Sequence, residues 1–260
     1  MREVGEKKEF PPGRLIDVGS HRLHIYCVGK GSPAVILDAG LGRGVSTWHF
    51  VQHEVAKFTH VCAYDRAGVG WSDTGPLPRN SQRIVNELHT LLIHAGVKGP
   101  YVLVGESFAG YNVRLYASQY PEEVVGLILV DATHVDHKTR LKSLLPGDFE
   151  KEAIRKANRN PDGLRIPEDF EESANQVRRS GPLPNIPLVV LTSGRGPELP
   201  EDFSRERYDQ VRMEQQRDLA KLVPNSKHII AEKSGHLIQI DQPEVVIHAI
   251  RQLVESHRHG

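Results

Sequence analysis

Residues 101–110 read Tyr-Val-Leu-Val-Gly-Glu-Ser-Phe-Ala-Gly, a short apolar run followed by a serine and a second apolar stretch. This order predicts a buried strand, an abrupt turn centred on Ser107 and a helix. So sharp a turn strains the backbone of its central residue and needs small neighbours two places away, which Gly105 and Ala109 provide. The pattern therefore predicts a serine hydroxyl held above the edge of a sheet, beside the N-terminus of the following helix.

Similar apolar runs recur along the chain and predict eight strands. The first two alternate polar and apolar residues on either side of Gly19 and Ser20, which is typical of an antiparallel hairpin at a sheet edge. The later runs are continuously apolar, as in parallel strands buried on both faces. The expected strands cover residues 15–18, 23–28, 34–37, 60–64, 101–104, 124–130, 188–192 and 227–231.

Segments with apolar residues at helical spacing separate these strands and cover residues 81–95, 108–120 and 243–256. Strands that alternate with helices predict right-handed crossovers and a mostly parallel α/β sheet flanked by helices. Residues 133–185 interrupt this alternation, since they are charged, rich in Pro and Gly, and too polar for a core of their own. We therefore expect one domain over residues 1–260, with a small helical cap at 133–185 between the sixth and seventh strands.

The charge balance excludes several classes of protein. The 260 residues contain 33 Lys or Arg and 33 Asp or Glu, so the chain lacks the basic field that nucleic-acid binding requires. No apolar run approaches the roughly 18 residues of a membrane-spanning helix, and the charged N-terminal stretch does not resemble a secretory signal. We expect a cytoplasmic protein, in which Cys27 and Cys62, both inside predicted strands, are buried reduced thiols.

A serine needs a base to become a good nucleophile, and His236 is the best placed of the 14 histidines. It follows the last predicted strand directly and precedes the last helix. That position is the carboxyl end of the sheet, where Ser107 also lies. We therefore expect His236 to take the proton of Ser107.

The loop after the third strand contains Gly40, Gly42 and Gly44, which allow close approach of the backbone to a ligand. The amides of Leu41 in this loop and of Phe108 after the serine are the expected donors to an oxyanion. The alternative interpretation is a phosphate-binding loop. It lacks support, because neither a Lys-Ser or Lys-Thr pair nor a G-x-G-x-x-G pattern follows.

Together these features resemble the α/β-hydrolase fold family over nearly the whole chain, and specifically its esterase-type serine hydrolases. Residues 64–73, Tyr-Asp-Arg-Ala-Gly-Val-Gly-Trp-Ser-Asp, and residues 234–243, Ser-Gly-His-Leu-Ile-Gln-Ile-Asp-Gln-Pro, look like segments of that branch. Epoxide hydrolases and haloalkane dehalogenases of this fold carry an aspartate where this chain has Ser107. The sequence departs from the family pattern at Ala109, Glu106 and Ala39, where relatives often have Gly, His and His.

The resemblance implies an acid between Ser107 and His236 in the chain order. One branch of the family places it at the end of the sixth strand, where this chain has Asp131. The more usual position follows the seventh strand, but no Asp stands at the usual offset there. Asp131 is our first choice, with a helix or turn cap as its structural alternative, and the remaining candidates are Glu198, Asp136, Glu201 and Asp202.

The predicted reaction is hydrolysis of small to medium carboxylic esters through an acyl-enzyme on Ser107, a mechanism that requires no cofactor or metal. The cap has few apolar residues, which suggests a modest pocket. These residues are chiefly Phe149, Ile154, Leu164 and Phe170, and the further lining residues are expected to be Trp48, Phe108 and Tyr111. Lactone, thioester or carbon–carbon hydrolysis remains open, as does a receptor-like binding module that does not turn its ligand over.

Two further patterns have competing interpretations. Residues 133–137, Thr-His-Val-Asp-His, contain part of a dinuclear zinc signature, but its remaining ligands are missing, so solvated or cap-contacting histidines are favoured. Glu106 stands next to the nucleophile. If it faces the pocket, it disfavours anionic substrates and raises the pKa of His236; otherwise it makes a polar contact behind the turn.

Overall fold

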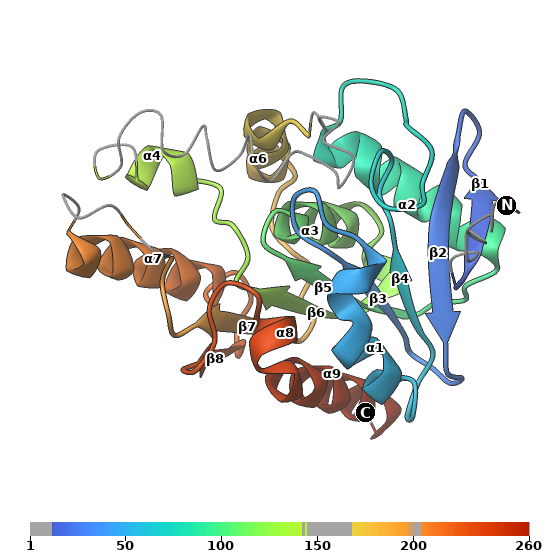
Figure 1. The fold of residues 1–260 in the computed structure, drawn as a ribbon. Coiled ribbons are helices and arrows are strands. Elements are labelled where there is room, and N and C mark those ends of the chain that lie inside the picture. The colour runs from blue at the N-terminus through green and yellow to red at the C-terminus, as the bar shows by residue number, and fades with distance from the viewer. Residues whose placement is uncertain (1–11, 142–143, 145–167, 198, 200–203, 260) are drawn as a thin grey trace, which may run out of the picture.

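A computed structural model describes residues 12–141, 144, 168–197, 199 and 204–259 (Figure 1). They contain one eight-stranded sheet in the order β1-β2-β4-β3-β5-β6-β7-β8. The pairs β1–β2 and β2–β4 are antiparallel and all other pairs are parallel. The eight predicted strands are confirmed as β1 Arg14–Asp17, β2 Arg22–Val28, β3 Ala34–Asp38, β4 Val61–Tyr64, β5 Tyr101–Glu106, β6 Val124–Val130, β7 Leu188–Ser193 and β8 Lys227–Ala231.

Helices cover both faces of this sheet (Figure 1). Alternate strand residues face opposite sides, so Ile36 and Leu103 belong to one apolar core with α2 and α3, while Val35 and Val102 belong to a second with α1 and α9. The helices are α1 His49–Val55, α2 Ser81–Ala95, α3 Ala109–Gln119, α4 His137–Leu141, α6 Phe170–Arg179, α7 Arg205–Leu219, α8 Ile238–Asp241 and α9 Pro243–His259, with short 3-10 turns at Val45–Trp48 and Pro121–Glu123.

The helix α2 shows how the sequence sets these boundaries. The Asn80 side chain accepts a hydrogen bond from the Arg83 amide at its start, and Gly96 adopts the left-handed conformation at its end. The predicted helices are confirmed, although α9 continues to His259. The helices α1 and α7 were not predicted. In α7 the buried residues are mainly polar, including Arg212, Gln215 and Gln216, so no apolar stripe marks it.

The interval 133–185 is described only in part. Its described helices are α4 and α6, and α6 packs against α2 and α3. Phe170, the first residue of α6, packs against the rings of Phe108 and Tyr111 at centroid distances of 5.9 and 5.4 Å. The other expected pocket residues of this interval, Phe149, Ile154 and Leu164, lie outside the described residues.

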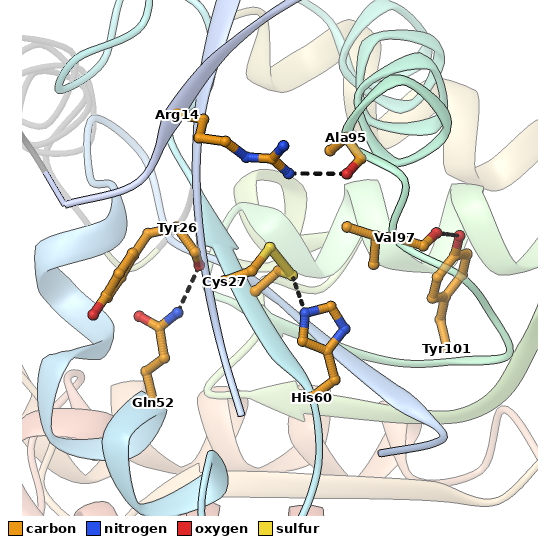
Figure 2. The surroundings of a disulfide bond; sticks show 9 residues. Arg14, Tyr26, Cys27, Gln52, His60, Ala95, Val97 and Tyr101 are labelled. Atoms are coloured by element: carbon orange, nitrogen blue, oxygen red, sulfur yellow. Dashed lines mark hydrogen bonds between the residues drawn. A yellow bond between two sulfur atoms is a disulfide. The ribbon is translucent and has the colours of Figure 1, made fainter. Parts of the chain in front are cut away.

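The prediction of reduced thiols is wrong, because Cys27 and Cys62 form a disulfide (Figure 2). Cys27 on β2 lies directly opposite Cys62 on β4 in the antiparallel register. The sequence could not reveal this pair, since which strands are neighbours is a long-range property. The expected cytoplasmic location stays a prediction, and the disulfide weighs against it because such bonds are rare in reducing compartments.

None of the described helices is long and apolar enough to cross a lipid bilayer.

Candidate active site

Ser107 follows β5 directly and has a φ of 55°, in the left-handed region that a residue with a side chain rarely adopts. Its amide donates to Val130 O at 3.0 Å, and its carbonyl accepts from Thr133 N at 3.0 Å. A Cβ on Gly105 would lie 2.6 Å from a methyl carbon of Val113, so the residue two places before the serine has to be glycine. The backbone thus forms the strained turn that the sequence predicted.

His236 and Asp131 are brought together from distant parts of the chain. The Nδ1 of His236 lies 2.8 Å from Oδ2 of Asp131. Asp131 follows the end of β6 with a φ of 40°, and His236 lies on the loop between β8 and α8. The His236 side chain is 48% exposed, whereas Asp131 is buried. The imidazole therefore has one nitrogen held by a buried acid, and its other nitrogen lies 3.4 Å from Glu106 Oε1.

Asp131 makes further contacts that hold its carboxylate charged. It accepts hydrogen bonds from the Ser193 amide and the Ser193 hydroxyl, both at 2.9 Å, and Arg212 Nη1 lies 3.5 Å away. Burial favours the neutral acid, but His236, the Ser193 amide and Arg212 together keep the pKa of Asp131 below its usual range. Arg212 also donates to Ser193 Oγ and Ser193 O, so it fixes the group that holds the acid.

Glu106, the residue before the serine, is fully buried and contacts both sides of the site. Its Oε2 accepts a hydrogen bond from the Gly40 amide at 2.6 Å, and its Oε1 lies 3.4 Å from Nε2 of His236. Burial raises the pKa of Glu106 above its usual value, although His236, Arg43 and the Gly40 amide act in the opposite direction. Glu106 therefore makes a polar contact behind the turn with one carboxylate oxygen and lies near His236 with the other, while its effect on anionic substrates stays a prediction.

The pKa of His236 is raised above its usual value. Loss of solvation lowers it, but the hydrogen bond that His236 donates to Asp131 and the negative charges of Glu106 and Asp131 outweigh that effect. Among the described residues, no hydrogen bond joins the Ser107 hydroxyl to His236. Transfer of the Ser107 proton to His236 thus stays a prediction. Contacts of this kind are often long before substrate binds.

The expected oxyanion donors are Leu41 and Phe108. In the part of the chain that the structure describes, neither amide hydrogen has a hydrogen-bond partner. Phe108 immediately precedes α3, and Leu41 follows Gly40, the residue that Glu106 binds. A Cβ at Gly40 would lie 2.5 Å from Glu106 Oε2, so only glycine allows this approach. Neither amide hydrogen is therefore already used within the described residues, so each can donate a hydrogen bond to a negatively charged oxygen.

A buried arginine fixes the same loop, and sequence reasoning missed it. The guanidinium of Arg66 donates to Asp38 at 2.6 Å, to Gly40 O at 2.7 Å, to Ala39 O, and to both oxygens of Glu168 at 2.5 and 3.2 Å. Burial disfavours its charge, but Glu168 and Asp38 more than compensate and raise the pKa of Arg66. The only signal in the sequence was its place inside the segment 64–73.

Of the other candidate acids, Asp136 is the one within the described residues, and its recorded partners do not include His236. Asp136 pairs with Arg178 at 2.9 Å, while Glu198, Glu201 and Asp202 lie outside the described residues. In the partial zinc signature, His134 accepts from the Asp136 amide, and His137 contacts Gln215.

The expectation that Trp48, Phe108 and Tyr111 line an open pocket is wrong, because all three side chains are fully buried. Trp48 lies in the core that α1 and α9 cover, and the other two lie in the core that α2 and α3 cover. Among the described residues, the cluster with metal-ligand spacing is Cys27, His60 and Cys62, on β2 and β4 rather than at this site.

The chain belongs to the α/β-hydrolase fold family, whose sequence profile matches residues 33–210. The fold agrees, with its mostly parallel eight-stranded sheet and a serine on the turn after β5. The sequence-based recognition of the family is therefore confirmed.

Individual relatives agree with this assignment. The uncharacterized protein YqjL of Bacillus subtilis is 29% identical over 223 residues, which cover 85% of this chain and 83% of YqjL. A thermophilic esterase from Thermogutta terrifontis superposes with a TM-score of 0.64 at 22% identity, covering 91% of this chain and 94% of the esterase. A putative lipase from Acinetobacter baumannii gives a TM-score of 0.67 at 21% identity, covering 95% and 92%. At these identities the solved structures share the fold.

Proposed function

We propose that this protein is a serine hydrolase that cleaves small to medium carboxylic esters, with Ser107 as nucleophile, His236 as base and Asp131 as the acid that orients it. The observation that carries the proposal is the 2.8 Å contact between His236 Nδ1 and Asp131, at the rim where the Ser107 turn lies. A buried, charged carboxylate on one nitrogen fixes the tautomer in which the other nitrogen accepts a proton.

The proposed reaction has two halves. Ser107 Oγ forms a bond to the ester carbonyl carbon while its proton moves to His236 Nε2. The carbonyl oxygen becomes an oxyanion and accepts hydrogen bonds from the Leu41 and Phe108 amides. The carbon–oxygen bond to the alcohol then breaks, and His236 returns the proton to that alcohol. Water repeats these steps on the acyl-enzyme, which releases the carboxylic acid and restores Ser107.

Glu106 acts in this proposal on both the base and the loop. Its carboxylate next to His236 Nε2 favours the protonated imidazole that forms during each half of the reaction. Its bond to the Gly40 amide holds the residue before the Leu41 donor. Loss of one oxyanion donor in comparable enzymes costs about 3 to 4 kcal/mol of barrier, so positioning of this loop matters for rate.

The preference for small to medium esters follows from the cap that we infer over residues 133–185 of a single domain. Its short length favours a modest acyl group, and Phe170 packs closely on Phe108 and Tyr111 beneath it. Lactones, thioesters and carbon–carbon bonds are attacked by the same arrangement, so they are the alternatives within this class.

Labelling with a fluorophosphonate tests the nucleophile. We expect one covalent adduct on Ser107, found by mass spectrometry of the digested protein, and no adduct on a folded Ser107→Ala variant. Ser193→Ala is not a suitable control, because Ser193 binds Asp131. The control variant is Ser46→Ala instead, since Ser46 is an exposed serine on the 3-10 turn Val45–Trp48. No adduct on the wild-type protein, or equal labelling of the Ser107→Ala variant, would overturn the proposal.

A second candidate is the receptor-like binding module on the same fold. One observation favours it: His236 Nε2 lies near Glu106 rather than bonded to the Ser107 hydroxyl. Sustained turnover separates the two functions. A serine hydrolase releases many equivalents of p-nitrophenol from p-nitrophenyl acetate or butyrate, whereas a binding module releases at most one per chain and then stops.

A further inference from the structure

The disulfide lies beside a histidine, and the three side chains form a cluster on the antiparallel part of the sheet (Figure 2). Cys27 and Cys62 are directly opposed on β2 and β4, with Cα atoms 4.1 Å apart. His60 precedes Cys62 by two residues, so its side chain lies on the same face. Its Nε2 is 3.7 Å from Cys62 Sγ, and all three ligand atoms lie within 4.8 Å of one another.

We propose that Cys27, His60 and Cys62 form a redox-controlled metal site, which binds one thiophilic divalent cation such as Zn²⁺ when the disulfide is reduced. Two thiolates and one imidazole are a common zinc ligand set. In a tetrahedral site with Zn–S of about 2.3 Å and Zn–N of about 2.0 Å, the sulfur and nitrogen ligands lie about 3.5 Å apart. The nitrogen already stands close to the required spacing from Cys62 Sγ and within 4.8 Å of Cys27 Sγ, and the two sulfur atoms have to separate.

The surroundings of the cluster suit a cation. Cys62 is buried while Cys27 and His60 are half-buried, which leaves one side open for a cation to enter. Two thiolates neutralise the charge of a divalent ion, and a water molecule from solvent supplies the fourth ligand.

Oxidation and metal binding exclude each other at this site. A dithiol reductant gives two electrons and two protons to the disulfide, which breaks the sulfur–sulfur bond, yields two thiols and converts the reductant to its own disulfide. The cation then displaces the two thiol protons and binds both thiolates. In the oxidised protein the sulfur atoms are bonded to each other and no thiolate is present. The disulfide links β2 to β4 in the oxidised protein, and the bound cation links them in the reduced protein. Only the reduced protein binds metal.

Cobalt(II) titration of the untagged, full-length protein tests the proposal directly. After reduction and removal of the reductant under nitrogen, we expect one Co²⁺ per chain, with thiolate-to-cobalt charge-transfer absorption and the intense visible bands of a four-coordinate site. Added Zn²⁺ should abolish these bands, because zinc binds such ligands more tightly. The same protein with its disulfide intact should show neither feature. The oxidised protein therefore serves as a control that requires no mutation.

Two histidine variants complete the experiment. His60→Ala removes a ligand but keeps both cysteines, and it should weaken cobalt binding by about tenfold or more, since one of three protein ligands is lost. His248→Ala, an exposed histidine on α9, should leave the titration unchanged. The proposal is overturned if the reduced protein shows no charge-transfer band, if the oxidised protein binds equally, or if His60→Ala binds like the wild type.

Discussion

Two charged clusters lie near the carboxyl edge of the sheet, and their polar atoms are hydrogen-bonded to different degrees. In the Arg66 cluster, formed by Arg66, Asp38 and Glu168, every guanidinium nitrogen donates at least one hydrogen bond. In the His236 cluster, formed by His236, Asp131 and Glu106, Glu106 Oε1 has no hydrogen-bond partner among the described residues. The His236 Nε2 lies 3.4 Å from that oxygen.

This difference distinguishes a charged cluster that stabilises the fold from one that can take part in a reaction. A fully paired network rigidifies the chain around it, while an incompletely paired one retains capacity to bind a proton or a ligand. The Arg66 cluster accordingly holds the loop that carries Leu41. The His236 cluster leaves one nitrogen open for the proposed reaction. Substitutions in the two clusters should therefore affect different measurements.

The largest effect is expected for Asp131→Asn, which keeps the shape of the side chain but removes its charge. An amide that holds the wrong tautomer of a catalytic histidine lowers kcat by about 10⁴-fold in comparable enzymes. Steady-state hydrolysis of a p-nitrophenyl ester measures this loss. Asp136→Asn is the matched control, because Asp136 pairs with Arg178 and should leave kcat unchanged. If Glu198→Gln loses activity and Asp131→Asn does not, the assignment of the acid is wrong.

Arg66→Met should chiefly lower the free energy of unfolding, and it should change the pH dependence of the site much less. Removal of one partner from a buried ion pair leaves Asp38 and Glu168 uncompensated and costs about 3 to 5 kcal/mol of unfolding free energy. Urea denaturation followed by circular dichroism gives the value. Arg22→Met provides the comparison, since the Arg22–Asp73 pair is exposed and should contribute little to the free energy of unfolding. Equal losses in the two variants would contradict a structural role for the Arg66 cluster.

The smallest effect is expected for Glu106→Gln, and it appears in the pH profile. His236 acts as a base only when neutral, so kcat/KM falls as the pH drops through its raised pKa. Since the charge of Glu106 raises that pKa, its removal should move the acidic limb of the profile to lower pH. Glu54→Gln, on the exposed side of α1, should leave the limb in place. An unchanged limb in Glu106→Gln would show that Glu106 acts only through Gly40.

Much of the fold could be predicted because its signals are local. The parallel strands are short apolar runs, and Gly105 with Ser107 marks the turn within ten residues. His236 could also be placed, because the carboxyl ends of parallel strands share one edge of the sheet. Asp131 came from a family resemblance rather than from its own surroundings, and its contact with His236 spans 105 residues.

The features that could not be predicted depend on contacts between distant parts of the chain, which no local sequence pattern encodes. Arg66 and Glu168 are 102 residues apart, and their pairing follows from where the chain before α6 returns to the sheet. Arg212 lies on a helix without an apolar stripe, so neither the helix nor its contact with Ser193 was predicted. The disulfide was missed for a similar reason, because the opposition of Cys27 and Cys62 requires β2 to pair with β4.

In the proposed hydrolase, Glu168 connects the segment before α6 to the loop that carries the Leu41 amide. One guanidinium joins Glu168, two residues before α6, to the carbonyl oxygens of Ala39 and Gly40. A bulky guest that pushed this segment outward would pull the attached backbone with it and misplace the neighbouring Leu41 amide. Oversized compounds would therefore be bound without being turned over efficiently, so selection by size would operate on the rate of the chemical step as well as on entry.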